Sequence, residues 1–455
     1  MRRLLPLALI ALGLSSLLLI RRPSERVVDV PSRPPSAPRE AAAPPDVAPS
    51  AAAPRKAPPR LSPRTAFERV IDALRAKDRA RAKEALEDMR LAFLPDPVPD
   101  AENAALLYKA AFARLAELSP EDSDLLGMPY DELTPEERER RREILAARPE
   151  ILDLLRRGAE LPRSDFGVKY EEGFLAELPH IAPMILAAKL LRTETEIGGN
   201  PADARAAIRL SEAVADEPIL VSQLVRSVCH GIAGEAMERA FDGEIPADLL
   251  RGLFGTPSAG RLKEGMEKSL LCELYAGTKL LLEEDPVALA AALGKDAAYI
   301  RRPDDPLAAD DLAHYGESLR ELGNLMSRPY WESRDLLGEL QKERGENAPA
   351  WAQLTRLVLP SLARAAARQA DAEARIGTSR VAAALRQYRD ARGDYPQSLE
   401  SIRDLLPESP IDPFTGRPYL YRREGTGFVV WSVGEDLLDG GGASVETDVR
   451  FRASR

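Results

Sequence analysis

The chain is 455 residues long, which favours two folded domains with accessory segments over a single small core. Its net charge is −10, and lysine and arginine are interleaved with glutamate and aspartate. Phosphate binding needs a concentrated basic surface, so this balance argues against a nucleic-acid partner. Only 5% of the residues are aromatic, which fits helices packed through alanine and leucine better than a β-sandwich.

An uncharged apolar run of 17 residues occupies positions 4–20, with two arginines on each side. This length is at the lower limit for a helix that spans a bilayer. A signal peptide has the same charged start but ends in a small-x-small site, for which only "ALG" at 11–13 qualifies. We therefore predict a membrane anchor over residues 1–22, with a cleaved signal as the alternative. The short N-terminal tail favours a single-pass protein of the inner (cytoplasmic) membrane whose bulk is extracytoplasmic or periplasmic.

Residues 23–64 are dense in proline and alanine and contain almost no large apolar side chain. Such a segment cannot bury a core, and its prolines favour extended conformations. At about 3.1 Å per residue it reaches up to about 130 Å. We predict a linker that holds the folded part away from the membrane.

From Thr65 the apolar residues recur at helical spacing. "TAFE" predicts a capping box with Thr65 as N-cap, "TPEE" predicts another at Thr134 and Glu137, and Asn200 before a proline begins a third helix. One later helix carries an apolar stripe of Val221, Leu224, Val225, Val228 and Ile232. No strict helical-repeat period is visible. We therefore predict an irregular multi-helix domain over residues 65–345.

The two cysteines, Cys229 and Cys272, allow two interpretations. In an oxidising compartment they can form one disulfide, which would stabilise the fold by about 4 kcal/mol in the loop-entropy model. Alternatively they are two small buried apolar residues.

The sequence contains no HExxH helix, no GxSxG elbow, no P-loop and no GxGxxG after a strand. Cys229 and His230 are neighbours on a helix, so their side chains point about 100° apart and cannot act as nucleophile and base for each other. Glu235 and Glu238 share a helix face, where metal ligation is the alternative to a solvated surface. His180, between prolines in an apolar context, fits a structural histidine better than a ligand. We predict no catalytic activity, and a helical enzyme with an unrecognised carboxylate site is an alternative.

The segment 346–455 differs from the rest because it combines a long helix with β-structure. The helix begins near Trp351, continues through Tyr388 with an expected kink near Gly377, and stops at Gly393. "YLYRR" and "FVVWSV" flank "EGTG", which predicts an antiparallel hairpin with a glycine-bearing turn. The predicted fold class is therefore mainly α: an irregular multi-helix domain followed by a small α+β module.

Three elements of this module occur in a fixed order: "ALRQYRDARGDYPQSLESI", "DPFTGRPYLYR" and "WSVGEDLLDGGG". Together they resemble the globular end of the major pseudopilin of type II secretion systems. That family has a long helix ending in a "YxxxxGxYP" element, a "DPWGxPY"-like turn and a final "SxGxDxxxGG" loop.

The resemblance implies a calcium site, because the last loop of that family binds calcium through carboxylates and backbone carbonyls. Asp436 matches the family's aspartate, Asp439 is the second carboxylate, and Val433 or Leu437 would supply carbonyls. Ca²⁺ takes several hard oxygen ligands, and glycines let the backbone turn its carbonyls inward. A polar turn that ends the hairpin is the alternative.

The chain also departs from the pseudopilin pattern. "MRRLLPLALIALG" has no prepilin-peptidase site, and a proline-rich linker and a large helical body separate the predicted anchor from the module. This argues against assembly into a filament. The whole arrangement also resembles uncharacterised membrane-anchored bacterial proteins of planctomycete type.

The function expected from these features is a membrane-tethered extracytoplasmic interaction or scaffold protein with a pseudopilin-like module. Its contacts are the membrane, through residues 4–20, and secretion or envelope proteins. An accessory component of a type II secretion or pilus-like system is the first alternative.

Overall fold

The computed structural model describes residues 63–198, 200–241, 259–282, 305–406, 411–443 and 448–454. The predicted anchor at 4–20 and nearly all of the predicted linker lie outside these residues. Within the described ranges, no helix combines the length and the apolar character that crossing a bilayer requires.

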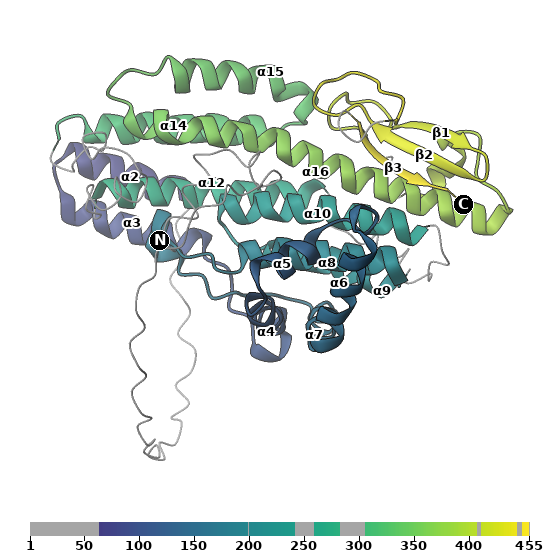
Figure 1. The fold of residues 1–455 in the computed structure, drawn as a ribbon. Helices are drawn as coiled ribbons and strands as arrows, with labels where there is room; N and C mark the ends of the chain where they lie inside the picture. Colours follow the sequence, from purple (N-terminus) through teal and green to yellow (C-terminus); the bar gives the residue numbers. More distant parts are fainter. Residues whose placement is uncertain are drawn as a thin grey trace, which may run out of the picture.

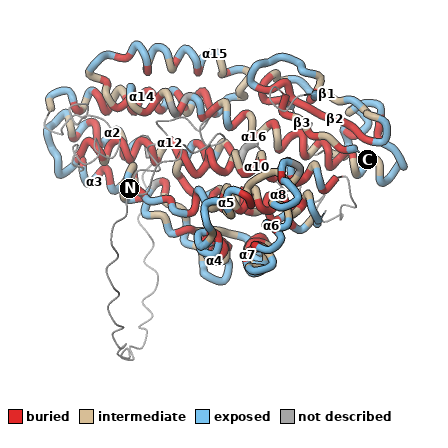
Figure 2. Tube along the Cα trace, in the orientation of Figure 1, coloured by how far each residue is buried: buried red, intermediate tan, exposed pale blue. Residues whose placement is uncertain are grey.

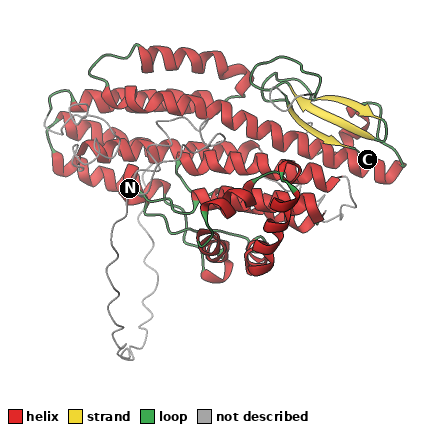
Figure 3. Ribbon diagram, viewed as in Figure 1, coloured by secondary structure: helices red, strands yellow, loops and turns green. Residues whose placement is uncertain are grey.

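The structure confirms the predicted fold class, since helices dominate and a small antiparallel sheet lies near the C-terminus (Figure 3). Figure 1 shows α10, α12, α14 and α16 running along the length of the molecule, with α4 to α9 gathered on one side. The α-helices are α2 (Pro63–Arg75), α3 (Arg79–Phe93), α4 (Ala104–Ala116), α5 (Pro120–Gly127), α6 (Pro135–Ala147), α7 (Glu150–Gly158), α8 (Ile181–Gly198), α9 (Pro201–Ser211), α10 (Leu220–Phe241), α12 (Ala259–Leu282), α14 (Ala308–Met326), α15 (Tyr330–Leu340) and α16 (Gln353–Arg392). Shorter 3-10 or π-helical turns are η3 (Asp100–Glu102), η4 (Tyr130–Glu132), η5 (Tyr170–Leu175), η6 (Glu212–Val214), η8 (Gln341–Glu346) and η9 (Leu399–Leu405).

Helix starts follow the predicted caps at two of three places. Thr134 and Glu137 form the reciprocal capping box of α6, and the Asn200 side chain accepts a hydrogen bond from the Ala202 amide at the start of α9. The prediction at Thr65 was wrong by two residues, because α2 begins at Pro63. A proline fits the first turn of a helix, where its missing N–H is not needed.

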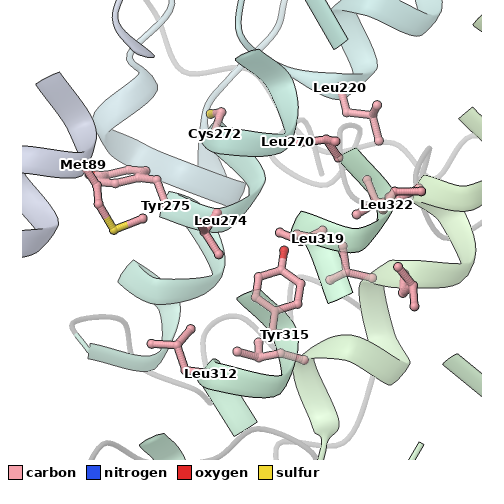
Figure 4. Close-up of a cluster of buried hydrophobic side chains, with 14 of the residues drawn as sticks. Met89, Leu220, Leu270, Cys272, Leu274, Tyr275, Leu312, Tyr315, Leu319 and Leu322 are labelled. Carbon is pink, nitrogen blue, oxygen red and sulfur yellow. The ribbon is translucent and has the colours of Figure 1, made fainter. Parts of the chain in front are cut away.

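Three of the clusters of buried side chains hold most of the helices together. The first joins α2, α3, α12, α14, α15 and the N-terminal half of α16; Figure 4 shows Tyr315 of α14 and Leu274 of α12 within it. The second lies among α4 to α10, and the third joins α9 and α10 to the C-terminal half of α16 and the sheet. In Figure 2 the buried residues follow the long helices through the middle of the molecule.

Helix α16 runs as one helix through Gly377, where a kink was expected. The glycine serves close packing instead: a Cβ at this position would lie 2.0 Å from the Tyr419 hydroxyl. Gly393 ends the helix as predicted, in the left-handed conformation with φ of 86°. Because α16 contributes to both the first and the third cluster, the predicted boundary between residues 345 and 346 does not separate two cores.

The sheet has the order β1 (Leu420–Glu424), β2 (Gly427–Ser432) and β3 (Val449–Ala453), all antiparallel. The predicted hairpin is β1–β2, with Glu424 opposite Gly427 across the turn. Strand β3 was not predicted, although its apolar residues alternate with arginines in the period of two that a half-buried strand requires.

The sheet is fastened to the helical body through its edge strand. The Glu238 carboxylate on α10 accepts a hydrogen bond from the Arg452 amide of β3 at 2.6 Å. Nearby, the Arg386 guanidinium on α16 donates to the Phe241 carbonyl at 3.1 Å. Burial, against the opposing effect of the Arg452 bond, raises the pKa of Glu238 to about 7. The sequence allowed two interpretations of Glu238, a metal ligand or a solvated surface residue. In the structure it instead joins the sheet to the helical body.

Candidate functional site

The two carboxylates predicted to hold calcium lie in the exposed loop that follows β2. Asp436 accepts a hydrogen bond from the Leu438 amide at 3.0 Å. Asp439 accepts one from the Trp431 indole and one from the Gly441 amide, each at 2.9 Å. These carboxylates thus accept hydrogen bonds from N–H groups of the loop and of Trp431 in β2, and calcium binding stays a prediction.

A third aspartate, which the sequence reasoning missed, closes the loop on its other side. Asp448 is almost wholly buried and accepts hydrogen bonds from the Gly440 amide at 3.2 Å and the Gly442 amide at 2.9 Å. Within the ranges that the structure describes, no three His, Cys, Asp or Glu side chains converge in a group that could hold a metal ion.

Cys229 and Cys272 are both buried free thiols, and the structure places them in different clusters. Burial raises the pKa of Cys229 to about 12. Burial, together with the nearby Glu273, raises the pKa of Cys272 well above its ordinary value. Reaction of a cysteine requires the thiolate, so neither thiol is placed for redox or nucleophilic chemistry in this conformation.

A buried polar network that the sequence did not reveal links the end of α9 to α10. His230 Nε2 lies 2.6 Å from a Glu212 carboxylate oxygen, and His230 Nδ1 lies 3.1 Å from the Ser211 hydroxyl. Arg226, which is fully buried, donates to both Glu212 oxygens at 2.9 and 3.0 Å. Burial favours a raised pKa for Glu212, but the bonds and charges of His230 and Arg226 outweigh it and lower the pKa to about 2.

A second pair extends this network towards α8. His180 Nε2 lies 3.1 Å from the Glu217 carboxylate, which also accepts a hydrogen bond from the Ser222 hydroxyl at 2.5 Å. The imidazole of His180 stacks on Phe166, with ring centroids 4.2 Å apart. Each member of this pair has its polar partner inside the protein, which is the arrangement of a structural histidine.

A hydrolase triad has the same residue types as Ser211, His230 and Glu212. The geometry of these three residues nevertheless does not support nucleophilic catalysis. The Ser211 hydroxyl donates to the Ile208 carbonyl at 2.6 Å, so its proton is not directed at the histidine. Its side chain is completely buried within a helix end, whereas a nucleophile must reach the substrate. The network therefore braces the connection between α9 and α10.

The described surface also contains a half-open groove between α2, α12 and α14, with a volume of about 640 Å³. α14 packs against both of the other helices, and all three contribute lining residues. The floor is apolar and includes Phe67, Ile71, Leu270, Leu274, Ala313 and Leu319. The charged residues of the rim are Glu68, Asp72, Arg75, Glu267, Glu317 and Arg320.

The polarity of the groove is divided between floor and rim. Every charged or polar side chain that lines it is exposed, while its leucine and isoleucine side chains are buried or half-buried. Small-molecule sites place a few polar groups inside the pocket to fix the ligand. Protein–protein interfaces instead have an apolar centre that excludes water and a polar rim that is accessible to solvent.

Comparison with models of protein families, with curated proteins and with solved structures finds no match for this chain. The groove was not predicted from sequence, because the helical stripes of α2, α12 and α14 do not say which helices are neighbours. The candidate site therefore rests on the geometry of these three helices.

Proposed function

We propose that this chain is a membrane-tethered extracytoplasmic interaction protein, without catalytic activity, that recognises a partner protein through the groove between α2, α12 and α14. The observation that carries this proposal is the division of the groove into an apolar floor and an exposed charged rim. A partner that covers the half-buried side chains of this floor, Phe67, Leu271 and Ala313, would remove apolar surface from water, which drives association, and the rim selects the partner.

The tether follows from the expected anchor and linker. The proposed linker is followed in the sequence by α2, whose Phe67 lines the groove. An extended linker of up to about 130 Å would let the groove search a large volume around its anchor.

Two matched glycine variants test the proposal in the full chain in native membranes. Gly323 lines the groove, and a Cβ there makes only an ordinary contact with Leu270 at 3.5 Å, so Gly323→Trp fills the groove without a backbone clash. Gly338 on α15 is exposed with open space around it, and Gly338→Trp is the control.

Quantitative affinity purification should recover the same partner with the wild type and with Gly338→Trp and lose it with Gly323→Trp. Recovery of an identical set of proteins with all three chains would contradict recognition through the groove.

A second function, as an accessory component of a type II secretion or pilus-like system, is favoured by the C-terminal module. Its support is the order of a long helix ending at Gly393, a hairpin and a glycine-rich loop. Unchanged secretion in a deletion strain would argue against it.

The calcium site implied by the same resemblance has a direct test. Thermal unfolding should shift upwards with calcium relative to chelator, and an Asp436→Ala, Asp439→Ala double variant should lose the shift. If the wild-type unfolding curves with calcium and with chelator superimpose, the loop is held by hydrogen bonds within the protein and not by calcium.

A further inference from the structure

We propose that the occupant of the groove is one amphipathic α-helix of the partner protein, with an apolar stripe flanked by lysine or arginine. This inference rests on the proposed function and specifies the partner's chemistry.

The shape of the groove fits a helix. Three helices border it, and on the face that lines the groove α14 has the small residues Ala313 and Gly323, while the Phe67 ring of α2 lies over Gly316. Small residues on that face allow a fourth helix to approach α14 closely, since interaxial distances depend on the side chains at the contact. An apolar stripe at positions i, i+3, i+4 and i+7 would then lie on the floor.

The charge of the rim determines which charged residues the partner helix should carry beside its apolar stripe. Four acids line it, Glu68, Asp72, Glu267 and Glu317, against the two arginines Arg75 and Arg320. Glu317 shares the Arg344 guanidinium at 3.7 Å, whereas no ion pair within the described ranges engages Asp72 or Glu267. Asp72 on α2 and Glu267 on α12 are thus available to lysine or arginine on either flank of the docked helix.

The same charges disfavour other occupants. A second copy of this chain would bring a net charge of −10 towards an acidic rim. A fatty acyl chain could use the apolar floor, but its affinity would not depend on the rim acids.

The test compares two synthetic peptides on the full chain in discs of zwitterionic lipid, with empty discs as a blank. Both have about 18 residues, roughly five helical turns, and the same leucine stripe; one has lysine flanks and the other glutamate flanks. Fluorescence anisotropy should show at least about tenfold tighter binding of the lysine peptide, with the difference shrinking as salt is raised. Gly323→Trp should abolish this binding and Gly338→Trp should not.

Variants of the rim acids then test whether these side chains recognise the lysine flanks of the peptide. Asp72→Asn with Glu267→Gln should remove most of the preference, whereas Glu121→Gln with Asp124→Asn, exposed acids on α5, should leave it intact. Equal binding of both peptides, or displacement of the lysine peptide by a fatty acid with no effect of the rim variants, would overturn the proposal. If the groove-filling variant loses its cellular partner but the peptides show no charge preference, the proposed function stands and only the partner's chemistry is wrong.

Discussion

At the scale of single residues, the ionisable groups of the interior separate into satisfied and unsatisfied ones. Glu212 has His230 and Arg226 as partners, whereas the buried Glu273 has a carboxylate oxygen with no hydrogen-bond partner among the described residues. The two carboxylates therefore have opposite pKa shifts, to about 2 for Glu212 and to about 8 for Glu273. They should also give the fold opposite dependences on pH.

Glu212→Gln should destabilise the protein at pH 7, on the order of 3 kcal/mol, because it leaves Arg226 and His230 buried without their carboxylate. A depressed folded pKa contributes stability above the unfolded value of 4.5, and that stability is lost as pH falls towards about 2. Urea unfolding of residues 63–455 at pH 7 and pH 3 should therefore show a smaller gap between wild type and variant at the lower pH. An equal gap at both values would contradict this account of the network.

Glu273→Gln should have the reverse effect. Burial raises the pKa of Glu273, so the folded state retains a proton that the unfolded chain releases, and stability falls as pH rises from 4.5 through about 8. The variant should match the wild type near pH 4 and exceed it by a few kcal/mol at pH 9. Part of the pH dependence should remain, because Glu238 is shifted in the same direction. A variant less stable than the wild type at pH 9 would show that the carboxylate has a charge partner.

At the scale of elements, α16 decides how the C-terminal module is attached. Its N-terminal half belongs to the first cluster and its C-terminal half supports the sheet, so one helix spans both parts of the chain. Figure 1 shows the sheet lying on the end of this helix. The close approach of Tyr419 at Gly377 makes that contact sensitive to a single methyl group.

Gly377→Ala should destabilise the protein by about 1–2 kcal/mol, although alanine favours helix formation, because its Cβ meets the Tyr419 hydroxyl. Gly338→Ala in α15 is the matched control, since nothing surrounds that position, and it should stabilise by about 0.5–1 kcal/mol. The denaturant midpoint should therefore fall for Gly377→Ala and rise for Gly338→Ala, relative to the wild type. Stabilisation of similar size in both would mean that the sheet does not pack on α16 as described.

Local chemistry explains which elements could be predicted from the sequence. The cap at Thr134, the helix stop at Gly393 and the β1–β2 hairpin each depend on residues close together in the chain. Strand β3 has five residues and pairs with β2 across a long loop, so its signal was weaker than that of the hairpin. Gly377 was expected to mark a kink, whereas in the continuous helix α16 it allows the close approach of Tyr419, since a glycine can serve packing as well as bending.

At the scale of the whole molecule, the candidate sites depend on contacts between distant residues. Glu212 and His230 meet although 18 positions separate them, and the groove joins α2 to α12 and α14 across some two hundred residues. Composition and periodicity predict amphipathic helices but not their neighbours. The sequence therefore predicted the fold class, whereas the groove required the structure, and the tethered arrangement stays a prediction.

We propose that the groove between α2, α12 and α14 contacts a partner in the native membrane. The most direct measurement places a photo-crosslinking amino acid at Asn324, an exposed rim position, and at Glu339, an exposed control position on α15. We predict a discrete crosslinked product from Asn324 that is absent from Glu339 and disappears when Gly323→Trp is added. No product from Asn324, or the same product from both positions, would contradict the claim.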